Sequence, residues 1–168
     1  YIGPAFEMGM DQAGCIHCGQ CVNACPTAAL SEHSNIEEVI QAINDPNKIV
    51  VFQVAPAVRA ALGEEFGLPF GTRVNGKIAA SLRRIGGPTC KVFDTNFGAD
   101  LTIMEEAYEL IERINKDGVL PMITSCSPGW IRLVEQYRPE IIPNLSSCKS
   151  PQQMFGAILK SYWAEKNS

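Results

Sequence analysis

Residues 48–54, Lys-Ile-Val-Val-Phe-Gln-Val, decide the class of fold. The run is short, apolar and rich in β-branched residues, and Ala55-Pro56 ends it. Runs of this length and composition are typical of a strand that lies buried in a parallel sheet. The sequence therefore predicts such a strand here, and the segments on either side of it show how the fold continues.

Helical and strand patterns alternate around this strand. Apolar residues recur at helical spacing ahead of it, at Ile36, Val39, Ile40 and Ile43. Behind it the sequence predicts two further strands, over 91–94 and 119–124, and helices over 58–66, 74–85, 100–114, 129–137 and from 150 onward. This alternation predicts an α/β fold with a parallel sheet joined by right-handed crossovers.

Sites in parallel sheets gather in the loops at the carboxyl ends of the strands. Three loops qualify, and we expect them to converge on one side of the sheet: Ala55-Pro56, Asn96-Phe97-Gly98 and Ser125-Cys126-Ser127-Pro128. We also expect Asp100 to cap the helix that follows the second loop.

The composition excludes several classes of protein. Of the 168 residues 46% are hydrophobic and 19% charged, as in a globular, core-forming chain, and the formal net charge is −4. That balance provides no basic surface for nucleic acid or for an anionic membrane. No apolar run reaches the roughly 20 residues of a membrane-spanning helix. The chain opens with Tyr1 rather than Met, so we expect a fragment or a processed product.

Seven cysteines are the unusual feature of the composition, and four of them fall between positions 15 and 25. Disulfides between residues three apart are strained, and dense cysteine spacing without a secretory signal points to metal binding. We therefore expect a reducing compartment or an oxygen-poor cell, with the cytoplasm as the location. The remaining cysteines are Cys90, Cys126 and Cys148.

Four cysteines have the spacing of the cysteine motif of bacterial ferredoxins, hereafter the run: Cys15, Cys18, Cys21 and Cys25. Three thiolates in such a tight loop wrap one face of a 4Fe-4S cubane, and Gly14 and Gly19 let the backbone turn closely. Because the last cysteine of the run ligates the other cluster in two-cluster ferredoxins, these residues form either half of such a protein or one cluster with four local ligands. A structural zinc site is the alternative, although zinc modules usually separate two cysteine pairs by about a dozen residues.

Three further stretches are informative together with this run and its Pro-Thr-Ala-Ala-Leu exit: Phe97–Glu106 (FGADLTIMEE), Thr124–Trp130 (TSCSPGW) and Leu145–Gln153 (LSSCKSPQQ). In this order, over essentially the whole chain, they resemble the iron-only (FeFe) hydrogenases. The resemblance implies a partial 4Fe-4S ferredoxin-type module over 1–32. It implies that 33–168 form the N-terminal lobe of a catalytic domain, truncated at Ser168.

The resemblance also implies an oxidoreductase that interconverts protons, electrons and dihydrogen. Its cofactors are 4Fe-4S clusters and an H-cluster, which is a cubane joined through a cysteine sulfur to a di-iron unit. Its partner is a ferredoxin or another electron-carrier protein or subunit. The family's two remaining motifs, which supply further cubane ligands, are expected downstream of Ser168, so we expect this piece alone to be inactive.

The resemblance assigns roles to individual residues. It implies a proton route through four of them, Glu109, Glu106, Ser146 and Cys126, and a di-iron pocket lined by Ala55, Pro56 and Gln152. The two glutamates are three apart and share one helix face. Without the family pattern they would be read as a solvated acidic face.

Position 127 departs from the family pattern. Family members have two adjacent cysteines before the proline, of which the first relays protons and the second ligates the cubane. Here Cys126 is followed by Ser127, and a serine hydroxyl is a poor iron ligand beside a thiolate. Cys148 is the candidate replacement ligand, Cys126 itself is another, and an inert buried cysteine is the alternative for Cys148 and above all for Cys90.

A function from a different class stays open beside the hydrogenase. It is a non-enzymatic iron–sulfur protein, either an electron-transfer module or a hydrogenase-like assembly protein. Ser127 gives this alternative some support, because such proteins diverge in the same motif. The complete set of four proton-route residues favours the hydrogenase.

Overall fold

The computed structural model describes residues 4–10 and 12–167, which divide into two compact units. One unit joins the chain up to His33 with Leu101–Ser150, and the other joins Ser34–Asp100 with the chain from Pro151 onward. Helix α5, Thr95–Asn115, belongs to both. Neither unit follows the division into 1–32 and 33–168 that the resemblance implies, and that division stays a prediction about the order of modules along the chain.

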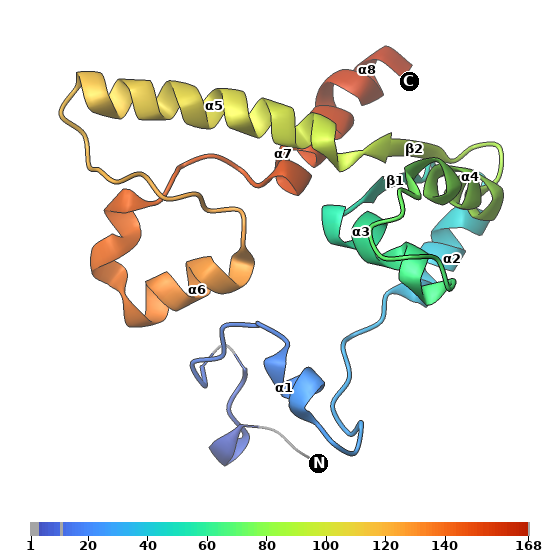
Figure 1. Ribbon diagram of the computed structural model, residues 1–168, viewed down its shortest axis with the longest axis horizontal. Helices are drawn as coiled ribbons and strands as arrows, with labels where there is room; N and C mark the ends of the chain where they lie inside the picture. The colour runs from blue at the N-terminus through green and yellow to red at the C-terminus, as the bar shows by residue number, and fades with distance from the viewer. Residues whose placement is uncertain (1–3, 11, 168) are drawn as a thin grey trace. The chain divides into compact units, whose positions relative to one another are not determined.

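The unit from Ser34 contains the sheet. Strands β1, Val51–Val54, and β2, Lys91–Asp94, pair in parallel and lie side by side in Figure 1, with Val51 opposite Lys91. The helices of this unit are α2 (Ile36–Asn44), α3 (Pro56–Glu65), α4 (Asn75–Gly86), the start of α5, α7 (Pro151–Ile158) and α8 (Ala164–Asn167), with a π-helical turn over Leu159–Trp163. The predicted α/β class and the first two predicted strands are confirmed.

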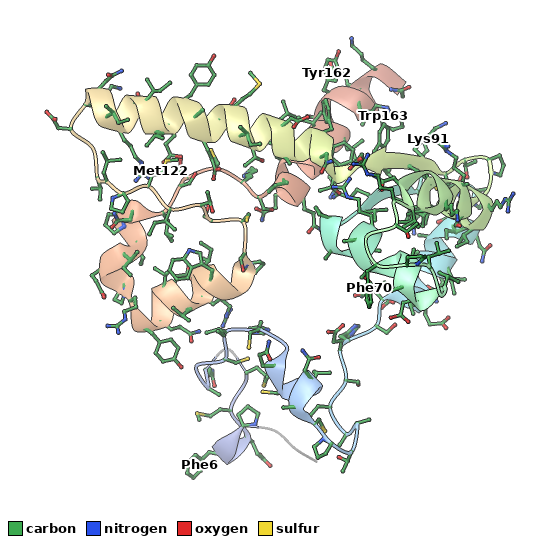
Figure 2. The ribbon with its side chains drawn as sticks, viewed as in Figure 1. Phe6, Phe70, Lys91, Met122, Tyr162 and Trp163 are labelled. Carbon is green, nitrogen blue, oxygen red and sulfur yellow. The ribbon has the colours of Figure 1, made fainter. Side chains whose placement is uncertain are left out.

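Aromatic side chains pack the C-terminal helical segment of this unit against the sheet. The Phe93 ring on β2 meets Phe155 edge-on at 5.5 Å and Trp163 at 6.2 Å, and Figure 2 labels Trp163 beside this strand. Gly98 lets α7 approach α5, because a Cβ there would lie 2.3 Å from the carbonyl oxygen of Pro151. Cys90 is buried as expected of an inert cysteine, and burial raises the pKa of its thiol.

The helix expected from Asp100 begins earlier, at Thr95, so Asn96-Phe97-Gly98 is its first turn and not a loop. The reason lies in the residues that end β2. Asp94 Oδ1 accepts a hydrogen bond from the backbone N–H of Asn96 at 2.9 Å, which is a helix-capping contact. Asp94 therefore takes the capping role that the sequence assigned to Asp100.

The prediction of a third strand over 119–124 is wrong. The sheet has two strands, and only Ile123 in that segment forms a bridge, parallel to Leu145 in the same unit. Side chains occupy the backbone groups that a ladder needs: the Val119 carbonyl accepts from Arg113, and the Pro121 carbonyl accepts from Asn144. Pro121 also lacks an N–H to donate.

The other unit carries the cysteine-rich loop and the segments that follow α5. It contains the short helices η1 (Ala5–Glu7), α1 (Gln20–Ala24) and η2 (Pro139–Asn144), most of α5, and α6 (Pro128–Tyr137). Ser127 caps α6 by accepting a hydrogen bond from the Trp130 N–H at 3.5 Å, and Pro128 occupies the first helical position. Across the described residues, no helix is both long enough and apolar enough to cross a membrane.

Candidate functional site

The loop over 14–25 bends through left-handed backbone positions. Gly14 and Gly19 have φ of 71° and 74°, and Gly19 leads into α1. Left-handed φ lets successive N–H groups turn toward one centre. The His17 N–H points at the Cys15 sulfur, 3.4 Å away. Cys15 and Cys25 are half-buried, whereas Cys18 and Cys21 are exposed.

Cys25 lies in surroundings that favour its thiolate. The Thr27 hydroxyl lies 3.6 Å from its sulfur. That hydrogen bond, with those from the backbone N–H groups of Leu30, Thr27 and Ala29, lowers the pKa of Cys25 to about 7. Hydrogen bonds to a sulfur that carries negative charge are also what tunes the thiolates of iron–sulfur clusters. The donor chemistry of this loop therefore fits the cluster.

The loop does not gather its sulfurs around one point. Within the described residues, no three side chains of His, Cys, Asp or Glu are placed to hold a single metal ion. Zinc needs four such ligands at about 2.3 Å from one centre. A cubane takes one thiolate at each iron, so its ligands stand apart around the cluster.

Glu109 on α5 is the centre of a second constellation. Its Oε2 accepts hydrogen bonds from the Ser146 hydroxyl at 3.0 Å and from the N–H and hydroxyl of Ser147 at 3.1 and 3.2 Å. Its Oε1 accepts from Arg113 Nη2 at 2.6 Å. The Glu109 and Arg113 side chains are each 16% exposed, so water screens this ion pair little.

The sequence reading missed Arg113, which ties α5 to the segment beside it. Its guanidinium also donates to four backbone carbonyls, those of Val119, Pro143, Asn144 and Leu145. The spacing of Glu109 and Arg113, four apart on a helix, is the only sequence signal for this pair. That spacing does not reveal the carbonyls, three of which the fold brings from about thirty residues away.

These contacts shift two pKa values in opposite directions. Burial pushes the pKa of Glu109 upward, but hydrogen bonds from Arg113, Ser146 and Ser147 outweigh burial and hold it below its usual range. Burial raises the pKa of Cys148, the hydrogen bond with Ser146 opposes it, and the negative charges of Glu109 and Glu106 raise it further. At neutral pH the site therefore presents an ionised carboxylate beside a protonated thiol.

Comparison with known proteins shows the family of this chain. Residues 48–168 match the family described as iron only hydrogenase large subunit, C-terminal domain, and residues 10–31 match the 4Fe-4S binding domain family. The first match covers more than half of the chain. The chain belongs to the iron-only hydrogenase family.

Individual relatives in the iron-only hydrogenase family agree with this. The NADP-reducing hydrogenase subunit HndD of Solidesulfovibrio fructosivorans is 52% identical over 98% of this chain and 29% of its own length. Iron hydrogenase 1 of Clostridium pasteurianum is 53% identical over 94% of this chain and 34% of its own length. A solved structure of a variant of the FeFe hydrogenase HydA1 from Chlamydomonas reinhardtii has a TM-score of 0.74 and 46% identity, covering 80% of this chain and 34% of that one.

The chain spans about a third of the length of these hydrogenases. More distant relatives exist outside the enzymes. The cytosolic Fe-S cluster assembly factor NAR1 of Candida dubliniensis is 31% identical over 91% of this chain and 26% of its own length. The hydrogenase relatives are therefore markedly more similar than the assembly factor.

The four residues expected to form a proton route lie in one unit, and the structure links them in part. Ser146 and Glu109 are in direct contact, and the charge of Glu106, one turn away on α5, acts on Cys148. Cys126 is exposed, and within the described residues no hydrogen bond joins it to the other three. The hydrogen bond between the Glu109 carboxylate and the Ser146 hydroxyl is thus formed, whereas the described residues show none that connects Cys126 to them.

Cys126 and Cys148 nevertheless lie on neighbouring segments. Beyond the bridge of Ile123 with Leu145, the Ser125 hydroxyl donates to the carbonyls of Ser146 and Cys148 at 2.9 and 3.2 Å. Cys126 therefore directly follows a residue whose side chain contacts the backbone of Cys148. Ser127, which departs from the hydrogenase motif, follows directly and caps α6.

The residues expected to line the di-iron pocket lie in the other unit. Ala55 precedes α3 and Pro56 begins it, and both are exposed. Gln152 is in the first turn of α7, where its carbonyl accepts a hydrogen bond from Gln53 Nε2 at 3.5 Å. Their role in a pocket stays a prediction.

One buried hydrogen-bond donor lies close in sequence to Cys126 and Ser127, and it suits an acceptor from outside the described residues. The indole Nε1 of Trp130 is buried, and the described residues supply no acceptor for it. A buried N–H without a partner costs about 1–3 kcal/mol. An acceptor brought by a bound cluster or by further protein would remove that penalty.

Replacing Glu109 by glutamine in the full-length protein is expected to lower the free energy of unfolding by about 1–3 kcal/mol, because the amide cannot satisfy Arg113 and both serines. The folded pKa of Glu109 is depressed, so its contribution is present above the unfolded pKa and is lost as pH falls through the folded pKa. Denaturation curves at about pH 7 and about pH 3 should therefore show a difference from wild type that shrinks on acidification.

Glu112→Gln is the matched control for this prediction. Glu112 on α5 pairs at the same spacing with Lys116, the residue that follows the helix, but both side chains are more than half exposed. Exposed pairs of this kind contribute about 0.3–0.5 kcal/mol. Equal losses in the two variants, or a Glu109→Gln loss that does not change with pH, would contradict the role given to the buried pair.

Proposed function

We propose that this chain is the ferredoxin-type end and first catalytic lobe of an iron-only hydrogenase, which interconverts protons, electrons and dihydrogen. The contact between the Ser146 hydroxyl and Glu109 carries the proposal. It supplies an acid–base pair that exchanges protons through a hydroxyl, next to the segment that contains Cys126. The similarity to iron hydrogenases at 52 and 53% identity supports it.

The cysteines at 15–25 would hold a 4Fe-4S cluster, and the segments around Cys126 and Cys148 would hold part of an H-cluster. When bound, these groups supply the route for electrons and the metal on which dihydrogen forms. The chain's own residues move the protons. Glu109 rests as a carboxylate, because Arg113 and the serines stabilise its charge, and so it acts as an acceptor.

Ser146 connects this acceptor to the neighbouring thiols. Its hydroxyl donates to Glu109 Oε2 and at the same time accepts from the Cys148 N–H at 3.1 Å. The backbone N–H only orients this hydroxyl, because an amide gives up no proton. Once Glu109 has taken up a proton, it can return that proton to the Ser146 oxygen while the hydroxyl gives its own proton to a thiol. Cys126 would receive the proton from this hydroxyl or from Glu106 once the loop over 125–127 brings its sulfur within reach.

The iron–sulfur assignment is tested by anaerobic reconstitution of the full-length protein followed by iron and sulfide analysis. Replacing Cys18 by serine should remove one cluster's iron and acid-labile sulfide, because a hydroxyl is a weaker ligand than a thiolate. Cys90→Ser is the control, since that buried cysteine is outside the loop. Stoichiometric zinc without acid-labile sulfide would contradict the assignment.

The enzymatic assignment is tested separately by hydrogen evolution from reduced methyl viologen and by uptake of hydrogen with the oxidised dye. We expect both directions in the full-length protein with its clusters in place. A fully loaded protein that is inactive in both directions would favour the alternative, an iron–sulfur protein of the assembly-factor kind.

The proposal extends to the electron-transfer partner of the protein and to its cellular compartment. A ferredoxin-type module supports an electron carrier, a ferredoxin or a companion subunit, as the partner. The cytoplasm stays a prediction, because one relative is named a periplasmic Fe hydrogenase large subunit. Fractionation of the source cells with an antibody to the protein measures the compartment.

A further inference from the structure

Two side chains of α6 hold the backbone of the cysteine-rich loop. Arg132 donates from Nε to the carbonyl of Cys15 at 3.2 Å. The Tyr137 hydroxyl donates to the carbonyl of Gly14 at 3.0 Å. Both bonds lie within one compact unit and connect residues more than one hundred positions apart.

Close backbone packing accompanies these two bonds. A Cβ on Gly14 would lie 2.7 Å from the Tyr137 oxygen, so only glycine leaves room for that hydroxyl. A Cβ on Gly129, near the start of α6, would lie 3.4 Å from the Ile16 carbonyl oxygen. The loop over 14–16 is therefore seated on α6.

Arg132 brings a positive charge to this contact. It is half-buried, and among the described residues no carboxylate forms an ion pair with it. A partly buried cation without a partner is unfavourable unless negative charge is close. A cubane with its thiolate ligands carries net negative charge, and Cys15 is the first of the expected ligands.

We infer that Arg132 and Tyr137 are positioning residues that dock the iron–sulfur loop on α6, and that Arg132 raises the reduction potential of the cluster held there. The inference rests on the proposed function. Potentials of iron–sulfur clusters are set by net charge, hydrogen bonds and solvent exposure, and Arg132 acts through the first two. Because α6 is capped by Ser127, directly after Cys126, one short helix fixes both the electron-carrying loop and the motif that carries the thiol.

The test is a redox titration of the full-length protein followed by electron paramagnetic resonance. The signal that disappears in Cys18→Ser identifies the cluster of this loop. Arg132→Gln, which removes the charge, should lower the ratio of reduced to oxidised cluster about tenfold at a fixed potential, a shift of about 59 mV for one electron. Arg138→Gln is the matched control: it removes an equal charge directly after α6, from a side chain that is 66% exposed and lies beside Glu140.

Tyr137→Phe tests the docking without a change of charge. It should leave the potential near that of wild type and speed hydrogen exchange of the loop amides, such as those of Ala13 and Cys15. If Arg132→Gln fails to load its cluster, Arg132→Lys is measured instead. It keeps the charge, so its reduction potential should stay close to that of wild type.

Two results would overturn the inference. One is an equal potential in Arg132→Gln and Arg138→Gln at full iron and sulfide content. The other is loss of the cluster in both Arg132 variants together with unchanged exchange in Tyr137→Phe. A shifted potential in a protein that neither makes nor consumes hydrogen would support the docking and overturn the proposed enzymatic function, so the two failures are distinguishable.

Discussion

Hydrogen turnover by the full-length protein is expected to fall by at least about 100-fold when Cys126 is replaced by alanine, because general acid–base groups contribute about 10²–10⁴-fold. A thiol both gives and takes a proton, whereas a methyl group does neither. The cubane spectrum should persist, since the proposed role is proton transfer and not ligation. Gas chromatography of evolved hydrogen and the spectrum of the same sample measure the two quantities together.

Cys90→Ala is the control for this variant. It also removes one sulfur, but from a buried position in the unit that contains the sheet. We expect normal turnover within about twofold, with a small loss of stability from the truncated side chain. If Cys126→Ala instead abolishes the cubane spectrum, Cys126 is a ligand and the proton role given to it is wrong.

The strands and most helices of this protein were predictable from local pattern. The run over 48–54 predicted β1, and the helical spacing of Ile36, Val39, Ile40 and Ile43 predicted α2. The start of α5 was missed for a physical reason. Any of several acidic residues can cap a helix, and the choice of Asp94 over Asp100 follows from the position in which β2 ends.

The strand expected over 119–124 shows a second limit of local pattern. Its apolar residues do suit a strand, yet the Val119 and Pro121 carbonyls are taken by Arg113 and Asn144. Contacts between a side chain and a distant carbonyl have no local pattern in sequence. The same limit hid the role of Arg113 at the site, whereas Glu109 and Ser146 were named through the family resemblance and do meet.

The thiol of Cys148 has two possible roles in this site, and the structure makes them separable. Its sulfur lies 3.7 Å from Glu109 Oε2, within reach of a hydrogen bond, which makes it a neutral member of the proton network. Burial and the two glutamate charges raise its pKa, so ligation requires iron to displace its proton. Its backbone carbonyl, however, accepts a hydrogen bond from Ser125, two residues before Ser127, the position at which the family resemblance implies a ligand.

Cys148→Ala in the full-length protein is therefore expected to abolish the cubane signal of the H-cluster, because Ser127 cannot replace the lost thiolate. Adding Ser127→Cys to that variant should restore the signal, at a stability cost of about 1 kcal/mol for the lost cap of α6. Ser147→Ala is the control, since it removes a hydroxyl bound to Glu109 without touching a sulfur. An undiminished cubane signal in Cys148→Ala, with slower turnover, would instead place Cys148 in the proton network and leave the fourth ligand to Cys126.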